Sequence, residues 1–111
     1  MDRETVADAR AVPDEPALQS AWPNPYQRSS GRHIAFRVTL NTVSRVELRV
    51  YNVLGQEVYR SAVAGDLPVG EHAMTWNGRR QNNQPLANGI YFASLLIDGA
   101  PRLQQKILIV D

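Results

Sequence analysis

The sequence of 111 residues contains no cysteine. This absence excludes thiol catalysis, disulfide crosslinks and cysteine-ligated zinc, and it leaves the cellular compartment open. Long apolar runs are also missing: none approaches the roughly 18 residues that a membrane-spanning helix needs. A basic segment followed by an apolar one, as in a signal peptide, is absent from the N-terminus. We therefore expect neither a transmembrane segment nor a signal peptide in this piece.

An excess of one charge sign is absent as well, because the formal net charge is only +1. The acids nevertheless concentrate in residues 1–21, which hold five acids and two bases, whereas residues 22–111 hold ten bases and six acids. Residues 1–21 show no sustained hydrophobic period and include Pro13 and Pro16, so we predict an acidic flexible linker there. The ten bases do not interleave with aromatic residues, which favours a solvated surface over a nucleic-acid-binding patch.

From His33 onward the apolar residues follow a period of two. Apolar residues alternate with polar ones over residues 34–40 and again over residues 45–51, as in strands with one buried face. The polar face of the second strand carries Arg45, Glu47 and Arg49. We expect this face to be solvated, with opposite charges pairing across strands.

Turn residues separate further strands. Gly55 supplies a positive φ for one hairpin, Pro68 and Gly70 form a turn, and Asp98-Gly99 closes the last hairpin. The strands between these turns are predicted over residues 57–62, 72–76, 90–97 and 102–110. About seven short strands in some 90 residues predict an all-β, immunoglobulin-like or fibronectin type III-like antiparallel β-sandwich.

The last two predicted strands carry apolar residues on both faces. Such strands are either central in the sandwich or expose one apolar face to a partner. We expect the final hairpin, Ile90 to Val110, to present an edge or an apolar face to a protein partner.

Catalytic and metal-binding patterns are weak. His33 and His72 are the only histidines, and no strained nucleophile turn such as Gly-x-Ser-x-Gly is present, so we expect no enzyme activity and a partly buried strand position for His72. The loop from Trp76 to Asn83 lacks carboxylates and carries Arg79 and Arg80. Arginine opposes a hard cation, so we expect no metal or other cofactor there and a turn stabilised by asparagine side chains.

Six aromatic residues are candidates for a sugar-stacking platform. Trp76 and either Tyr91 or Phe92 fall on alternating strand positions, which favours a core role over a platform. The six residues are Trp22, Tyr26, Tyr51, Trp76, Tyr91 and Phe92.

Four spaced motifs occur in order between residues 22 and 111. They consist of Pro23, Asn24 and Pro25; Tyr51, Asn52 and Gly55; Gly89 and Tyr91; and Lys106 followed by Ile107, Leu108, Ile109 and Val110. This order resembles the type A C-terminal sorting domain of the type IX secretion system of Bacteroidetes, which is related to the immunoglobulin-like domain of flagellar hook-capping proteins. Asn77, Asn83 and Asp111 depart from the pattern, because Asp, Gly and a basic residue are common there.

The resemblance implies a sorting sandwich over residues 22–111 and identifies the motif residues as a recognition motif. Its partners would be the type IX translocon, an outer-membrane shuttle protein, a surface sortase and an upstream cargo domain such as a secreted enzyme or adhesin. The cargo would travel through the periplasm to the cell surface, with the domain removed by cleavage within residues 1–21.

Two non-catalytic alternatives stay open, a carbohydrate-binding or adhesive module and a structural Ig-like spacer. For the sorting role we expect that replacing Lys106 and Ile107 with alanine blocks export and leaves the fold intact.

Overall fold

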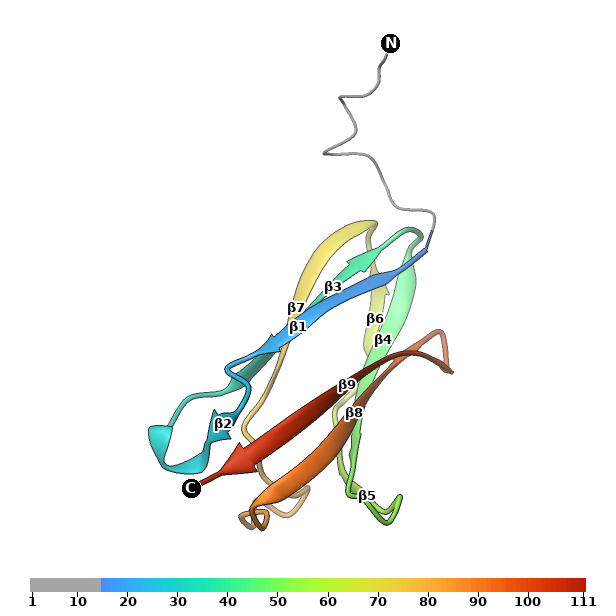
Figure 1. Cartoon of the computed structure of the whole chain (residues 1–111). Coiled ribbons are helices and arrows are strands. Elements are labelled where there is room, and N and C mark those ends of the chain that lie inside the picture. Colours follow the sequence, from blue (N-terminus) through green and yellow to red (C-terminus); the bar gives the residue numbers. More distant parts are fainter. Residues whose placement is uncertain (1–14) are drawn as a thin grey trace.

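The computed structural model describes residues 15–111, which form a sandwich of two β-sheets (Figure 1). A short 3-10 turn at Arg28–Ser30 follows the second strand. The strands are β1 (Ala17–Trp22), β2 (Tyr26–Gln27), β3 (Ile34–Leu40), β4 (Ser44–Tyr51), β5 (Glu57–Arg60), β6 (Ala64–Leu67), β7 (Gly70–Trp76), β8 (Gly89–Ile97) and β9 (Ala100–Val110).

The two sheets differ in size. One has the strand order β1-β3-β7, and the other has the order β2-β9-β8-β4-β5, with β6 also pairing with β4. Every pair is antiparallel except the two-residue pair of β2 with β9, which is parallel. The predicted all-β, immunoglobulin-like sandwich is therefore confirmed. The described residues contain nine strands rather than about seven, because β1 and β2 were not predicted and β6 follows β5 as a separate strand on β4.

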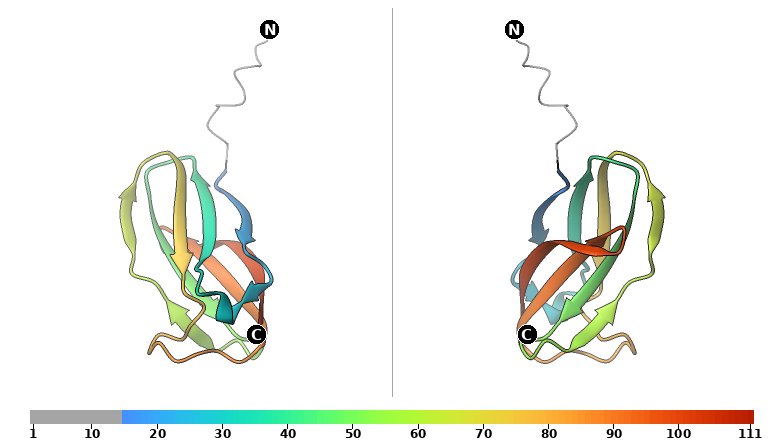
Figure 2. Two further views of the ribbon diagram at one scale, coloured as in Figure 1. Left: turned by 90° about the vertical axis from the view of Figure 1, so that its left-hand side faces the viewer. Right: turned by 90° about the vertical axis from the view of Figure 1, so that its right-hand side faces the viewer.

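The core lies between the two sheets, which Figure 2 shows from two sides. Alternate residues of β3 and β4 face inward and are fully buried, as the period-two pattern predicted. Trp76 is 1% exposed, and its ring centroid lies 5.7 Å from that of Tyr59. Tyr91 is buried as well, whereas Phe92 is 39% exposed, which confirms the predicted core role for Trp76 and for Tyr91 of the pair. Tyr26 is also buried. Leu86, from the long loop before β8, also enters the core.

The predicted linker extended too far into the chain. Residues 17–21 belong to β1, which pairs with β3 in the register Leu18 opposite Val38. The sandwich therefore starts at Ala17 and not at residue 22. Because β1 is an edge strand that buries only Ala21 fully, its sequence carries almost no alternation to detect. Residues 1–14, the remainder of the predicted linker apart from positions 15 and 16, lie outside the described residues.

The outer face of β4 is not uniformly solvated, contrary to expectation. Glu47 is only 8% exposed. Its carboxylate contacts Arg49 Nε at 3.1 Å and Arg60 Nε at 3.7 Å. Only the contact with Arg60 crosses between strands, from β4 to β5. Partial burial is tolerable for this carboxylate because two guanidinium groups compensate its charge.

Candidate protein-binding surface

The segment that enters the sandwich is fastened to the last strand by one side chain. Asn24 Nδ2 donates a hydrogen bond to Lys106 O at 2.8 Å, and Leu108 N donates to Asn24 Oδ1 at 3.0 Å. The side-chain amide of Asn24 thus makes the two hydrogen bonds that a neighbouring strand would make with the outer edge of β9. Pro23 and Pro25, which flank Asn24, both follow cis peptide bonds. Next along the chain, residues 26 and 27 of β2 pair with residues 109 and 110 and so occupy the same edge of β9.

Three motif residues from β4 and β9, namely Tyr51, Lys106 and Leu108, meet two residues of β8 on the outer face of the larger sheet. Lys106 lies opposite Phe92, and Phe92 lies opposite Tyr51. In the next row Leu108 lies opposite Ile90. Directly opposed residues share a face, so these five side chains form one surface, which we call the outer patch: Tyr51, Ile90, Phe92, Lys106 and Leu108.

The outer patch is amphipathic and accessible. Ile90, Phe92 and Leu108 are 40%, 39% and 38% exposed, although their strands are central in the sheet. Both expectations for the last hairpin thus hold in part, since β8 and β9 are central strands and also leave one apolar face open. A basic side chain beside exposed apolar ones suits contact with a protein surface.

Other motif residues face inward and cannot touch a partner. Tyr91, Ile107 and Ile109 are buried, and Tyr91 OH donates to Ala87 O at 2.7 Å. Gly89 lies opposite Ile109 with a φ of 147°. Because Ile107 is 0% exposed, alanine there would open a cavity in the core. The double alanine variant at Lys106 and Ile107 is therefore expected to lose stability as well as any partner contact.

Asn52 organises the turn between β4 and β5. Its Oδ1 accepts hydrogen bonds from Leu54 N and Gln56 N, each at 3.0 Å. Gly55 has a φ of 80°, as predicted for this turn. The turn leaves Val53 67% and Leu54 79% exposed at its tip, next to the end of β4 that carries Tyr51. The motif Tyr-Asn-x-x-Gly therefore encodes a turn and one residue of the outer patch.

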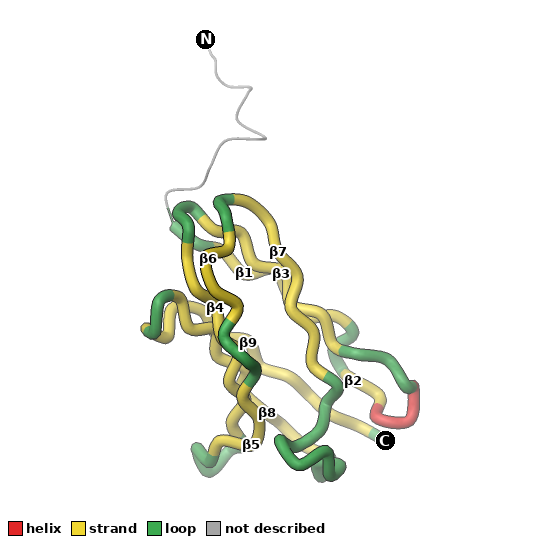
Figure 3. The backbone as a smooth tube through the Cα atoms, turned by 180° about the vertical axis from the view of Figure 1, so that it is seen from behind, coloured by secondary structure: helices red, strands yellow, loops and turns green. Residues whose placement is uncertain are grey.

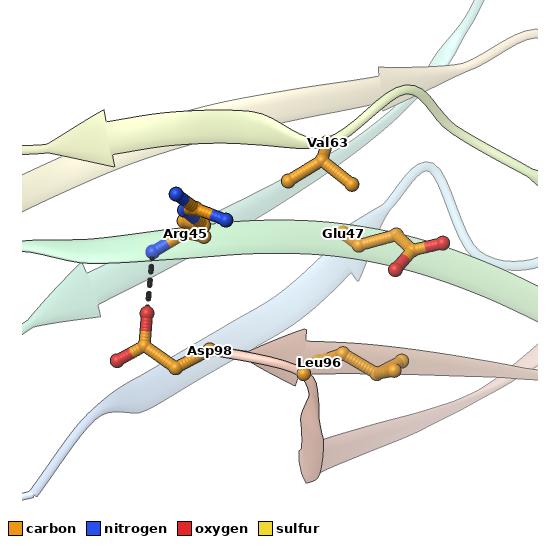
Figure 4. A pocket seen from close by; sticks show the side chains of 6 residues that line it. Arg45, Glu47, Val63, Leu96 and Asp98 are labelled. Atoms are coloured by element: carbon orange, nitrogen blue, oxygen red, sulfur yellow. Dashed lines mark hydrogen bonds between the residues drawn. The ribbon is translucent and has the colours of Figure 1, made fainter.

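A separate hollow of about 420 Å³ lies on the same sheet, near the turn between β8 and β9 (Figure 4). Arg45 N donates to Asp98 Oδ1 at 2.8 Å, and Asp98 N donates to Arg45 O at 2.9 Å, which fastens the turn to β4. Glu47 raises the pKa of Arg49 above its ordinary value, chiefly through their hydrogen bond. Both carboxylates that line this hollow, Asp98 and Glu47, therefore bind groups of the domain itself.

His72 and the asparagines of the loop after Trp76 have structural partners. His72 is half-buried, as predicted, and its Nε2 lies 2.7 Å from Pro68 O. In the loop after Trp76, Asn77 Oδ1 accepts from Arg79 N and Asn82 Oδ1 accepts from Gln84 N, each at 3.0 Å. The prediction of a turn stabilised by asparagine is confirmed.

Comparison with known proteins identifies the family. The model of the FlgD Ig-like domain matches residues 24–95, well over half of the chain. The chain belongs to the FlgD Ig-like domain family. A comparison of this Ig-like domain with curated proteins finds no match. Among residues 15–111 no helix is long and apolar enough to cross a membrane.

Solved structures share the fold of this FlgD Ig-like domain. FlgD from P. aeruginosa superposes with a TM-score of 0.55 and 21% identity, over 84% of this chain and 71% of that chain. Dimeric latent PorU from Porphyromonas gingivalis gives a TM-score of 0.68 and 15% identity over 86% of this chain. PorZ of the same organism, an essential bacterial surface component of the type IX secretion system, gives 0.58 and 12%, also over 86% of this chain. The domain spans only 9% of the PorU chain and 12% of the PorZ chain.

Proposed function

We propose that this domain is a type A C-terminal sorting signal, which directs an upstream cargo protein through the type IX secretion system to the cell surface. The observation that carries the proposal is the pairing of Asn24 with β9. The side chain of Asn24 is hydrogen-bonded to the backbone of Lys106 and Leu108, which lie 82 and 84 residues further along the chain. The first and last motifs of the sorting pattern are therefore parts of a single structure. The shared fold with PorZ, a surface component of that system, supports the same role.

Recognition in this role is non-catalytic and uses the outer patch. Its apolar side chains bury area against the translocon or the shuttle protein, and Lys106 adds a charge that fixes orientation. Binding to the edge of β9 is less favourable over residues 106–110, because Asn24 and β2 already occupy that edge. The face of the sheet is thus the better recognition surface at this end of the domain.

We propose that the surface sortase cleaves on the N-terminal side of Ala17, within the range of residues 1–21 expected from the sequence. A paired strand does not enter a protease cleft without leaving its sheet, and β1 is paired with β3 from Ala17 onward. Cleavage before this residue releases the domain with both sheets complete.

The experiment that tests the sorting role uses a fusion protein. A signal peptide and a fluorescent protein are placed ahead of residues 1–111 and expressed in a type IX-competent bacterium and in a sibling without the translocon. We expect surface fluorescence and loss of the domain only in the competent strain. Equal periplasmic retention in both strains would refute the proposal.

A paired variant tests the outer patch within the same fusion. Serine at Phe92 and Leu108 removes apolar surface from the patch, whereas serine at Val43 and Val69 removes it from turns elsewhere. Val43 and Val69 are 60% and 42% exposed, so both variants should fold. We expect only the patch variant to lose surface display, by at least about tenfold, as for loss of a binding hot spot. Equal display of both variants would exclude the patch as the recognition surface.

A structural Ig-like spacer is the second candidate, and the family match favours it. The superposition with P. aeruginosa FlgD covers 71% of that chain. A spacer predicts that the fusion stays in the periplasm of both strains and that the purified domain associates with itself in analytical ultracentrifugation. A monomer that is exported only in the competent strain would exclude the spacer.

A further inference from the structure

The fold brings together a basic cluster that is dispersed in the sequence. Arg28, Arg32, His33 and Arg79 line one hollow of about 270 Å³, together with Tyr26, Gly31 and Asn77. Among residues 15–111, no carboxylate lines this hollow. It lies at the end of the sandwich where the short 3-10 turn approaches the C-terminus of the described chain (Figure 3). A second hollow of about 470 Å³ shares Arg32 and continues past Pro23 and Pro25.

The backbone beneath these bases is held rigidly. Tyr26 OH donates to Arg32 O at 2.6 Å and lies 3.3 Å from Asn77 O, so one side chain joins the two loops that carry the cluster. Arg79 O accepts from Trp76 Nε1 at 2.9 Å, and Arg79 N is bound by Asn77. Such support places the bases before any ligand arrives, which lowers the entropic cost of binding.

The guanidinium groups of Arg32 and Arg79 lack a carboxylate partner within residues 15–111, whereas that of Arg28 has one. Arg28 binds Leu86 O and contacts Asp111 at 3.6 Å, so its charge is partly compensated. Arg32 and Arg79 have no carboxylate within 4.0 Å anywhere in residues 15–111. Arg79 Nη1 donates to Asn83 O at 3.2 Å, which leaves its other donors available.

Trp22 positions Arg32. The guanidinium carbon lies 5.4 Å from the centroid of the Trp22 ring, a cation–π contact that holds the group by its face. A guanidinium held by its face still presents N–H donors at its edge, and these match the oxygens of a phosphate group. Trp22 is 63% exposed, so the pair stands at the surface beside the hollow.

We propose that this cluster is a binding site for a phosphate group, either free or carried as an ester on a larger ligand. Arg32 and Arg79 supply charge-assisted hydrogen bonds to the phosphate oxygens, and His33 contributes a ring N–H. Arg28 exchanges its exposed counter-ion Asp111 for the ligand. The site is distinct from the outer patch, which lies on the outer face of the larger sheet and shares no residue with the cluster.

NMR titration of the full 111-residue chain tests the site. Inorganic phosphate, glucose 6-phosphate and glucose are added in turn at constant ionic strength. We expect saturable shifts centred on the amides of Gly31, Arg32 and Arg79 with both phosphates and none with glucose. Tighter binding of glucose 6-phosphate identifies an esterified ligand, whereas equal or tighter binding of inorganic phosphate identifies the free anion.

Matched variants separate a specific site from general attraction of anions. We expect Arg32→Gln and Arg79→Gln each to weaken phosphate binding about tenfold, as loss of one charge-assisted hydrogen bond predicts. Arg32→Lys should keep part of the affinity, and Trp22→Ala should weaken binding about threefold because Arg32 loses its support. The control is Arg102→Gln, which removes an exposed arginine on β9 outside the hollow and should leave the affinity unchanged.

Two results would overturn the proposal. One is the absence of saturable shifts at these amides, and the other is an equal loss of affinity in the Arg102 control. Thermal melts of each variant check that the domain is folded.

Discussion

Tyr26 shows how one residue joins distant parts of this domain. Its hydroxyl bonds to the carbonyl of Arg32, and its ring lies against Gly78. A Cβ atom at Gly78 would approach Tyr26 Cε2 to 2.5 Å, and the φ of this glycine is 74°. Gly78 is therefore required for two reasons, the left-handed backbone and the space that the ring occupies.

The two reasons can be separated by comparing two glycines. Gly55 has a similar φ of 80°, but a Cβ there meets nothing within 4 Å. We expect Gly55→Ala to lower the free energy of unfolding by about 1–2 kcal/mol, the cost of a left-handed backbone. Gly78→Ala should cost a further 1–3 kcal/mol or so, because the methyl group displaces the ring. Urea denaturation measures both, and equal losses would show that Tyr26 moves aside freely.

At the scale of the element, the two faces of β9 have different roles. Ile107 and Ile109 face the core and are fully buried, whereas Lys106 and Leu108 belong to the outer patch. The same short run thus stabilises the fold through one set of residues and offers contacts through the other. Variants that mix the two sets cannot distinguish export defects from unfolding.

A neighbouring pair of alanine variants tests this division. We expect Ile107→Ala to lower the free energy of unfolding by about 2–5 kcal/mol, as for a buried isoleucine that leaves a cavity. Leu108→Ala should cost less than about 1 kcal/mol, since its side chain is 38% exposed. Chemical denaturation checks both values. A larger loss for Leu108→Ala would mean that the register of β9 against β8 is wrong.

At the scale of the whole molecule, the boundary of the sandwich depends on β1. This strand pairs with β3 from Ala17 to Trp22, with Ala21 buried and Leu18 packed against the core. It covers one edge of the three-stranded sheet, and without it β3 becomes an edge strand. Removing β1 would therefore expose both apolar surface and unpaired backbone groups.

Two truncated chains test this boundary. One begins at Glu15 and keeps β1, and the other begins at Pro23 and lacks it. We expect the shorter chain to be less stable by at least about 2 kcal/mol, because it loses the burial of two apolar side chains and a row of backbone hydrogen bonds. Thermal and urea unfolding of the two chains provide the measurement. Equal stability of the two chains would mean that β1 does not stabilise the fold and that the domain starts at residue 22.

The strands over residues 34–40 and 45–51 could be predicted because alternation is a local property of the chain. The strand over residues 90–97 could be predicted because a short apolar run between turn residues is a local signal as well. The turns at Gly55 and Asp98-Gly99 were predictable for the same reason, since a positive φ selects a few residue types. These local signals were sufficient for the all-β sandwich. The four motifs could be recognised as well, because each of them lies within one short stretch of sequence.

Contacts between distant segments were beyond the reach of such signals. Four features depend on which segments the two sheets place side by side. They are the burial of Glu47, the pairing of β1 with β3, the hydrogen bonds of Asn24 to β9 and the basic cluster around Arg32. Local pattern therefore specified the strands and their turns, whereas packing alone determined which polar groups are buried, paired or gathered into a site, because burial and pairing are properties of neighbours in space and not along the chain.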